Sequence, residues 1–169
     1  MAELFSSRLP VILQTEMTEC GLACLAMVAR YHGHDVDLNS LREKYLLSMR
    51  GTSLKQIIKI ASHLSLSPRA LRVDLDQLHK LTTPAILHWD LNHYVVLKRV
   101  RGDRVEIHDP GIGQRTLPLS KVSDHFTGVA LELSPAAEFV PVTDRIRPRL
   151  PDHRSSLVGA NRALPQPLA

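Results

Sequence analysis

Four residues of this chain have the side chains that hydrolysis by a nucleophile requires: Cys20, His93, Asp109 and Gln14. A thiol nucleophile needs a histidine that takes its proton and returns it to the leaving amine, and a third group that orients the imidazole. The oxyanion that the attack creates needs hydrogen-bond donors already in place. The backbone N–H of Cys20 and the side-chain amide of Gln14, six residues upstream, are the candidates. These residue types indicate covalent catalysis by a cysteine.

The element that must position the thiol is the stretch 14–31, QTEMTECGLACLAMVARY. Its polar lead-in ends at Cys20, and the following apolar run predicts a buried helix of about three turns. Cys20 then lies at the helix N-terminus, where unpaired N–H groups and the helix dipole favour a thiolate. A free cysteine more often packs in a core. We prefer that interpretation for Cys24, which has apolar neighbours one turn further on.

The histidine and the carboxylate belong to a predicted hairpin. His93 begins a β-rich stretch, 93–97, and Gly102-Asp103 turns the chain into a second stretch, 104–108, which Asp109 ends. Pairing around this turn brings Asp109 close to His93. Taken singly, a strand histidine is usually half-buried and an aspartate before Pro-Gly usually belongs to a turn. Their joint placement with a cysteine at a helix start favours a catalytic set.

The remaining pattern places helices before strands. A helix at 38–45, capped by Asp37 or Asn39, precedes one that begins at a Ser53/Gln56 capping box. An edge strand is predicted at 66–73 and a helical turn or two at 74–79. The other predicted elements are strands at 85–89, 93–97, 104–108, 114–117 and 129–133, and a short helix at 121–126. Helices followed by an antiparallel sheet indicate an α+β fold.

Composition limits the domain organisation and the partners. The 169 residues suit one domain, 1–134, plus an extension, 135–169, that carries six of the eleven prolines and reads as a linker or disordered tail. Residues 134–169 hold five arginines against three acidic residues, so they account for +2 of the net charge of +4. With only 4% aromatic residues, no nucleic-acid surface is expected.

Localisation, metals and redox chemistry are constrained as well. No apolar run approaches the roughly 18 residues that span a membrane, no secretory signal is present, and two free thiols fit a reducing compartment, so we expect a cytoplasmic chain. His32 and His34 lack further ligands at a suitable spacing, so no metal and no cofactor are expected. Cys20 and Cys24 lack the Cys-x-x-Cys spacing of redox enzymes, which makes a thiol redox sensor the weaker alternative.

The motifs resemble those of the double-glycine leader peptidase, a papain-like cysteine peptidase domain at the N-terminus of ABC transporters that export bacteriocins. The match covers roughly residues 9 to 134. Residues 14–33 most resemble the colicin V and microcin exporter branch. The matching motifs are Gln14 with Glu19-Cys20-Gly21-Leu22-Ala23-Cys24-Leu25, His88-Trp89 with His93-Tyr94-Val95-Val96-Leu97, Asp109-Pro110 with Gly113, and Phe126-Thr127-Gly128.

Position by position, the resemblance implies that Cys20 is the nucleophile, His93 the base, Asp109 its orienting group and Gln14 the oxyanion-hole donor. His88 matches a family position to which the resemblance assigns no catalytic role, and we interpret it as structural. The implied fold is papain-like, with N-terminal helices packed on a C-terminal antiparallel sheet.

The resemblance also implies a substrate and partners. The substrate would be a bacteriocin- or microcin-type precursor peptide, cleaved after the Gly-Gly or Gly-Ala that ends its leader. Members of the family continue into transmembrane and ATPase domains of an ABC transporter, which this sequence lacks. We therefore expect either a domain separated from its transporter or a peptidase that meets it in trans, at the cytoplasmic face of the inner membrane.

A non-catalytic module that docks leader or cargo peptides for export is the alternative function. Degenerate relatives keep the fold and have lost the cysteine, whereas this chain has Cys20. A docking surface has no use for the full set of Gln14, Cys20, His93 and Asp109, so the sequence favours a peptidase.

Overall fold

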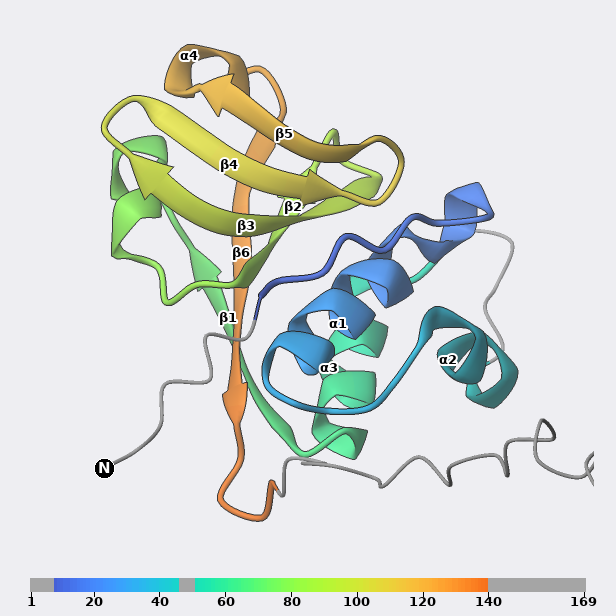
Figure 1. Cartoon of the computed structure of the whole chain (residues 1–169). Helices are drawn as coiled ribbons and strands as arrows, with labels where there is room; N and C mark the ends of the chain where they lie inside the picture. The colour runs from blue at the N-terminus through green and yellow to red at the C-terminus, as the bar shows by residue number, and fades with distance from the viewer. Residues whose placement is uncertain (1–7, 46–50, 140–169) are drawn as a thin grey trace, which may run out of the picture.

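Four α-helices, two 3₁₀ helices and a six-stranded antiparallel sheet form the α+β fold that the sequence predicts, in a computed structural model that describes residues 8–45 and 51–139 (Figure 1). The helical elements are the 3₁₀ helix η1 (Met17–Glu19), α1 (Cys20–Tyr31), α2 (Leu38–Lys44), α3 (Leu54–His63), the 3₁₀ helix η2 (Leu75–Lys80) and the short α4 (Leu119–Val122). The strands are β1 (Leu66–Arg72), β2 (Ala85–Trp89), β3 (His93–Arg101), β4 (Arg104–Asp109), β5 (Gly113–Pro118) and β6 (Phe126–Pro135).

Helix α1 is the buried helix that the apolar stretch predicts, since every residue from Cys20 to Ala29 is buried. Gly21 allows the start of α3 to approach the start of α1. A Cβ atom at this position would lie 2.9 Å from Cδ1 of Ile57 and 3.1 Å from Cβ of Thr52. The missing side chain therefore brings the N-terminal ends of two helices together beside Cys20.

Local signals define the helix ends. Gly33, with a φ of 93°, follows the end of α1, as its sequence position predicts. The side chain of Asp37 accepts a hydrogen bond of 2.7 Å from the N–H of Ser40 and caps α2. Ser53 and Gln56 form the predicted capping box of α3. The predictions for these three helices are confirmed.

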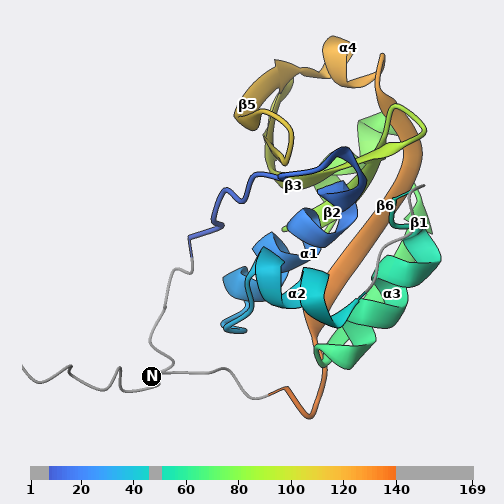
Figure 2. The ribbon, with the colours of Figure 1, turned by 90° about the vertical axis from the view of Figure 1, so that its right-hand side faces the viewer.

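The strands follow the order β1-β6-β2-β3-β4-β5, which makes β1 the edge strand that Pro68 predicts. Successive residues of a strand point to opposite faces of the sheet. On one face, residues such as Ile86 and Val96 pack with α1 and α3. On the other, Leu87 and Val95 join a second core cluster that includes Leu78 of η2. Helix α2 packs against α1, and α3 packs against β1 (Figure 2).

The β3–β4 hairpin contains a bulge that determines which residues share a face. Arg99 pairs with Glu106, whereas Leu97 pairs with Ile107, so Lys98 is an extra residue on β3. Continued by one residue, this register places Asp109 opposite Val95, on the same face as His93. Without the extra residue Asp109 would lie opposite Val96 and point to the other face.

Element boundaries depart from the sequence prediction near the end of the sheet. Helix α4 spans Leu119–Val122 instead of 121–126, because Phe126 is drawn into β6, where it pairs with Trp89. Strand β6 is correspondingly longer than the predicted 129–133. Strand β3 continues to Arg101 instead of ending at residue 97.

The predicted tail is described only in its first part. Phe139 packs against His34, with ring centroids 5.9 Å apart. Phe139 lies beside the core cluster between the sheet and helices α1 and α3, which we call the helix-side core. Residues 140–169 lie outside the described residues, so the boundary predicted at residue 134 stays a prediction. Within 8–45 and 51–139, no helix is both long enough and apolar enough to cross a membrane.

Candidate active site

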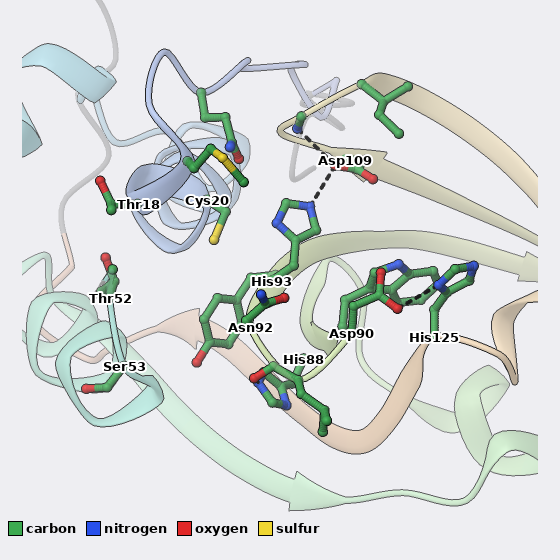
Figure 3. Close-up of a pocket in the computed structure, with 18 of the residues that line it drawn as sticks. Thr18, Cys20, Thr52, Ser53, His88, Asp90, Asn92, His93, Asp109 and His125 are labelled. Carbon is green, nitrogen blue, oxygen red and sulfur yellow. Dashed lines mark hydrogen bonds and ion pairs between the residues drawn. The ribbon is translucent and has the colours of Figure 1, made fainter. Parts of the chain in front are cut away.

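A cleft of about 970 Å³ opens where the start of α1, the start of α3 and the β2–β3 and β4–β5 turns meet. Its lining includes all four residues that the sequence singles out, Gln14, Cys20, His93 and Asp109. In Figure 3 the imidazole of His93 lies between Cys20 on α1 and Asp109 at the end of β4. The structure therefore brings together, from three separate segments, the groups proposed from the sequence.

His93 and Asp109 form a hydrogen-bonded pair. The Nε2 atom of His93 lies 2.8 Å from Oδ1 of Asp109. Because the carboxylate accepts, Nε2 carries the proton, and the second ring nitrogen, Nδ1, faces Cys20 (Figure 3). The carboxylate thus fixes both the tautomer and the direction of the imidazole.

Asp109 is held from two further sides. The N–H of Gly111 donates to Oδ1 at 2.9 Å, and Nη1 of Arg115 lies 3.6 Å from Oδ2. The residue is only 3% exposed. Burial would raise the pKa of Asp109, but the hydrogen bonds from His93 and Gly111, with the charges of His93 and Arg115, lower it below the usual value. The carboxylate therefore stays ionised although it is buried.

The pKa of His93 is raised to about 9. Burial alone would lower it, but the hydrogen bonds and negative charges of Asp109 and Cys20 outweigh that effect. At neutral pH the imidazole of His93 is therefore protonated beside the thiol. This is the state in which a histidine can hand a proton to a departing amine.

The two cysteines occupy different environments, as the sequence predicts. Cys20 lines the cleft, whereas Cys24 is fully buried in the helix-side core. Burial raises the pKa of Cys24 well above its usual value, and the nearby Cys20 and Asp109 raise it further. Cys24 is therefore a packing residue, and Cys20 is the thiol that meets the cleft.

Gln14 reaches the cleft from an extended segment that crosses the β4–β5 turn. Its backbone N–H donates to the carbonyl of Pro110 at 2.9 Å. Upstream, Nδ1 of His108 donates to the carbonyl of Pro10 at 2.9 Å. The side-chain Oε1 of Gln14 is buried and has no hydrogen-bond partner among residues 8–45 and 51–139. Gln14 thus lines the same cleft as Cys20, and its amide oxygen is not engaged by the described residues.

His88 also lines the cleft, but both of its ring nitrogens are occupied. Nε2 donates to the carbonyl of Leu91 at 3.0 Å, and Nδ1 lies within hydrogen-bond distance, 2.8 Å, of the hydroxyl oxygen of Thr127. A histidine bonded at both nitrogens has none left for proton transfer. The geometry supports the structural interpretation of this residue.

Two features of the site are absent from the sequence prediction. Arg115 supports Asp109 diagonally across the β4–β5 hairpin, in which Asp109 pairs with Gly113. Counting the register from the Pro110-Gly111 turn would have found it. A second histidine–aspartate pair, His125 with Asp90, also lines the cleft, with Nδ1 and Oδ1 2.7 Å apart. These two residues are 35 positions apart, and no motif marks them.

The fold and the cleft define a papain-like cysteine peptidase, in which a thiol at a helix start faces a histidine on the sheet. The chain belongs to the Peptidase C39 family, whose model matches residues 8–138. The resemblance, the fold class and the class of enzyme expected from the sequence, a cysteine peptidase, are thereby confirmed.

Two curated relatives from Escherichia coli are similar over 157 residues, which is 93% of this chain. The probable microcin-H47 secretion/processing ATP-binding protein MchF is 48% identical, and the colicin V secretion/processing ATP-binding protein CvaB is 47% identical. The match spans 22% of the length of each relative.

Solved structures of peptidase domains match the fold. A double glycine motif protease from an AMS/PCAT transporter, in complex with the leader peptide, superposes with a TM-score of 0.73 at 36% identity. That match covers 78% of this chain and 94% of the other. The peptidase domain of Streptococcus ComA gives a TM-score of 0.69 at 27% identity, covering 76% of this chain and 99% of that domain.

Proposed function

We propose that this chain removes the leader from a bacteriocin- or microcin-type precursor peptide by cleaving after a Gly-Gly or Gly-Ala pair. The observation that carries the proposal is the convergence of Cys20, the His93–Asp109 pair and Gln14 in one cleft of a C39 family member. The matched protease whose structure holds a leader peptide, and the secretion and processing proteins of E. coli, support this choice of substrate.

In the proposed reaction the Cys20 thiolate attacks the carbonyl carbon of the second residue of the pair. His93, protonated at neutral pH, gives its Nδ1 proton to the leaving amine as the C–N bond breaks and a thioester forms. Water then adds to the thioester while His93 takes its proton, and the thiolate departs. Asp109 keeps its hydrogen bond to Nε2 throughout and orients the ring.

The oxyanion formed in each half of the reaction needs donors that do not have to rearrange. The backbone N–H of Cys20, at the first turn of α1, is one proposed donor. The side-chain amide of Gln14 is the other proposed donor, because Gln14 lines the cleft and its backbone is bonded to the carbonyl of Pro110.

We attribute the selection of a glycine pair to the residues that line the cleft around the nucleophile. Thr18 and Thr52 lie on the side of Cys20 away from His93 (Figure 3), and Thr52 is only 6% exposed. A bulky side chain beside the scissile bond would have to displace these groups. The cost of that displacement in the transition state discriminates against larger residues.

The partners and the location belong to the same proposal. The E. coli relatives are secretion and processing ATP-binding proteins, and this chain matches about a fifth of their length. We propose that cleavage is coupled to export by ABC transporter transmembrane and ATPase domains, at the cytoplasmic face of the inner membrane. The alternative is a domain that docks leader or cargo peptides without cleaving them.

Mass spectrometry of precursor digests tests the function. The wild-type chain should cut a double-glycine precursor once, directly after the pair, and Cys20→Ala should bind the precursor without cutting it. Changing the penultimate glycine to valine, or shortening the leader, should slow cleavage, because remote binding energy helps to position the scissile bond. Binding without cleavage by the wild-type chain would favour the docking alternative, and equal cleavage of all three peptides would exclude leader specificity.

A further inference from the structure

The loop that joins Gln14 to Cys20 is organised by a buried carboxylate. Glu19, the residue before Cys20, is 1% exposed. Its Oε2 accepts the backbone N–H groups of Thr15, at 3.0 Å, and Glu16, at 3.1 Å. Its Oε1 accepts the Nε–H of Arg42. One side chain therefore binds the backbone directly after Gln14 and connects it to the start of α1.

Arg42 supplies the charge that permits this burial. A buried carboxylate is costly unless it is paired and hydrogen-bonded. The guanidinium of Arg42, on α2, also donates to Oδ1 of Asn39 at 2.9 Å and to Oγ1 of Thr15 at 3.4 Å. The hydrogen bond from Arg42 lowers the pKa of Glu19, and the hydrogen bonds from the two backbone N–H groups lower it further, whereas burial alone would raise it. Glu19 is therefore ionised, and both of its oxygens accept.

The opposite side of the same loop is fixed to the sheet. The N–H of Gln14 donates to the carbonyl of Pro110, which follows Asp109. Gln14 is thus held between two backbone anchors, its own bond to the β4–β5 turn and the adjacent bond from Thr15 to Glu19. Loss of the second anchor would free the peptide unit that follows Gln14 and let its side chain turn away from Cys20.

We propose that Glu19 is a positioning residue for the peptidase reaction: its Oε2 clamps the loop backbone and thereby keeps the side chain of Gln14 in the cleft that Cys20 lines, and Arg42 serves as its counter-charge. This role rests on the proposed function and on Gln14 as an oxyanion donor. A purely structural role for the Glu19–Arg42 pair is the competing explanation, and it predicts a loss of stability without a specific loss of turnover.

Two neutral double variants separate the clamp from the charge. In Glu19→Gln/Arg42→Met, the amide oxygen can take the place of Oε2 and accept both N–H groups, and no charge is left buried. In Glu19→Leu/Arg42→Met, the charge is also gone but the acceptor is missing. Arg69→Met/Glu132→Leu removes a guanidinium–carboxylate pair between β1 and β6, outside the cleft lining, in which Glu132 also accepts the backbone N–H of Thr82 at 2.8 Å, and it serves as the control.

The measurement is kcat with a double-glycine precursor, per active site titrated with iodoacetamide and well below each melting temperature. Glu19→Gln/Arg42→Met and the control should stay within about threefold of wild type, and Glu19→Leu/Arg42→Met should lose roughly 10- to 100-fold in kcat with KM little changed. In a Gln14→Ala background, the two Glu19 variants should differ by less than about threefold, because the group that they position is gone.

Equal kcat values for the two Glu19 variants would overturn the role of Glu19, as would a difference that persists in full without the Gln14 side chain. Both results require a wild-type chain that cuts the precursor. A wild-type chain that cuts no precursor would instead overturn the proposed function, and with it this role.

Discussion

The cleft contains two histidine–aspartate pairs, His93 with Asp109 beside Cys20 and His125 with Asp90 beside Trp89. Their N–O distances, 2.8 Å and 2.7 Å, are almost the same. Their surroundings differ: the side chains of the first pair are 22% and 4% exposed, and those of the second are 37% and 48% exposed. The hydrogen-bond distance therefore does not distinguish the pair proposed for catalysis.

Burial, additional donors and a thiol make the difference. Asp109 is bound by Gly111 and Arg115 as well as by His93, and His93 faces Cys20. The ring of His125 instead stacks on the indole of Trp89, with centroids 5.3 Å apart and planes at 10°. A charged interaction that is screened by water contributes little, whereas the same interaction in a buried site can hold a proton in place.

The largest expected effect comes from exchanging the two histidines for alanine. His93→Ala should abolish precursor cleavage, as should Cys20→Ala, because both the nucleophile and its proton partner are required. His125→Ala should change kcat/KM by less than about fivefold, the size of a peripheral contact of about 1 kcal/mol. Steady-state cleavage assays test this contrast, and a comparable loss in both histidine variants would mean that the wrong pair has been assigned.

Gln14→Ala should reduce kcat by roughly 100- to 1000-fold, the usual loss for one oxyanion donor, with KM little changed. This substitution tests a further difference between the two histidine–aspartate pairs, because no oxyanion donor is proposed beside His125 and Asp90. A rise in KM with an unchanged kcat would instead make Gln14 a substrate contact.

Asp109→Asn should lower kcat/KM by roughly 10- to 100-fold, the worth of a hydrogen bond to a charged group. Asp109 helps to raise the pKa of His93 to about 9, so the imidazolium of the wild type persists below that pH and is lost above it. Without the carboxylate, the alkaline limb of the kcat/KM profile should move to lower pH. Asp90→Asn is the matched control, and its profile should coincide with that of wild type.

Arg115→Ala should have the smallest effect, a decrease of about two- to fivefold in kcat/KM, since its contact with Asp109 is long and partly exposed. The loss should shrink at high salt, because the wild type then loses the same partial interaction. A salt-independent loss would show that Arg115 acts through packing or through the substrate.

Much of this site could be predicted from the sequence because its signals are local. The junction of polar and apolar residues at Cys20 marks a helix start, and the Gly102-Asp103 turn places His93 and Asp109 on paired strands. The partnership of Glu19 with Arg42 could not be predicted, because it joins residues 23 positions apart. A charged residue read alone is usually assigned to the surface. Only the packing of α2 against α1 shows why Glu19 is buried.

Because Lys98 is an extra residue on β3, Asp109 shares a face with His93 only while the number of residues between them stays odd or even as it is in this chain. Any insertion or deletion of one residue between His93 and Asp109 that leaves the turn intact would send the carboxylate to the opposite face of the sheet. A change of two residues would restore its direction and only lengthen or shorten the hairpin. In loop grafts and chimaeras of this hairpin, the number of residues between His93 and Asp109 should therefore change only by an even number. This requirement matters more than keeping the sequence, even at positions far from the cleft.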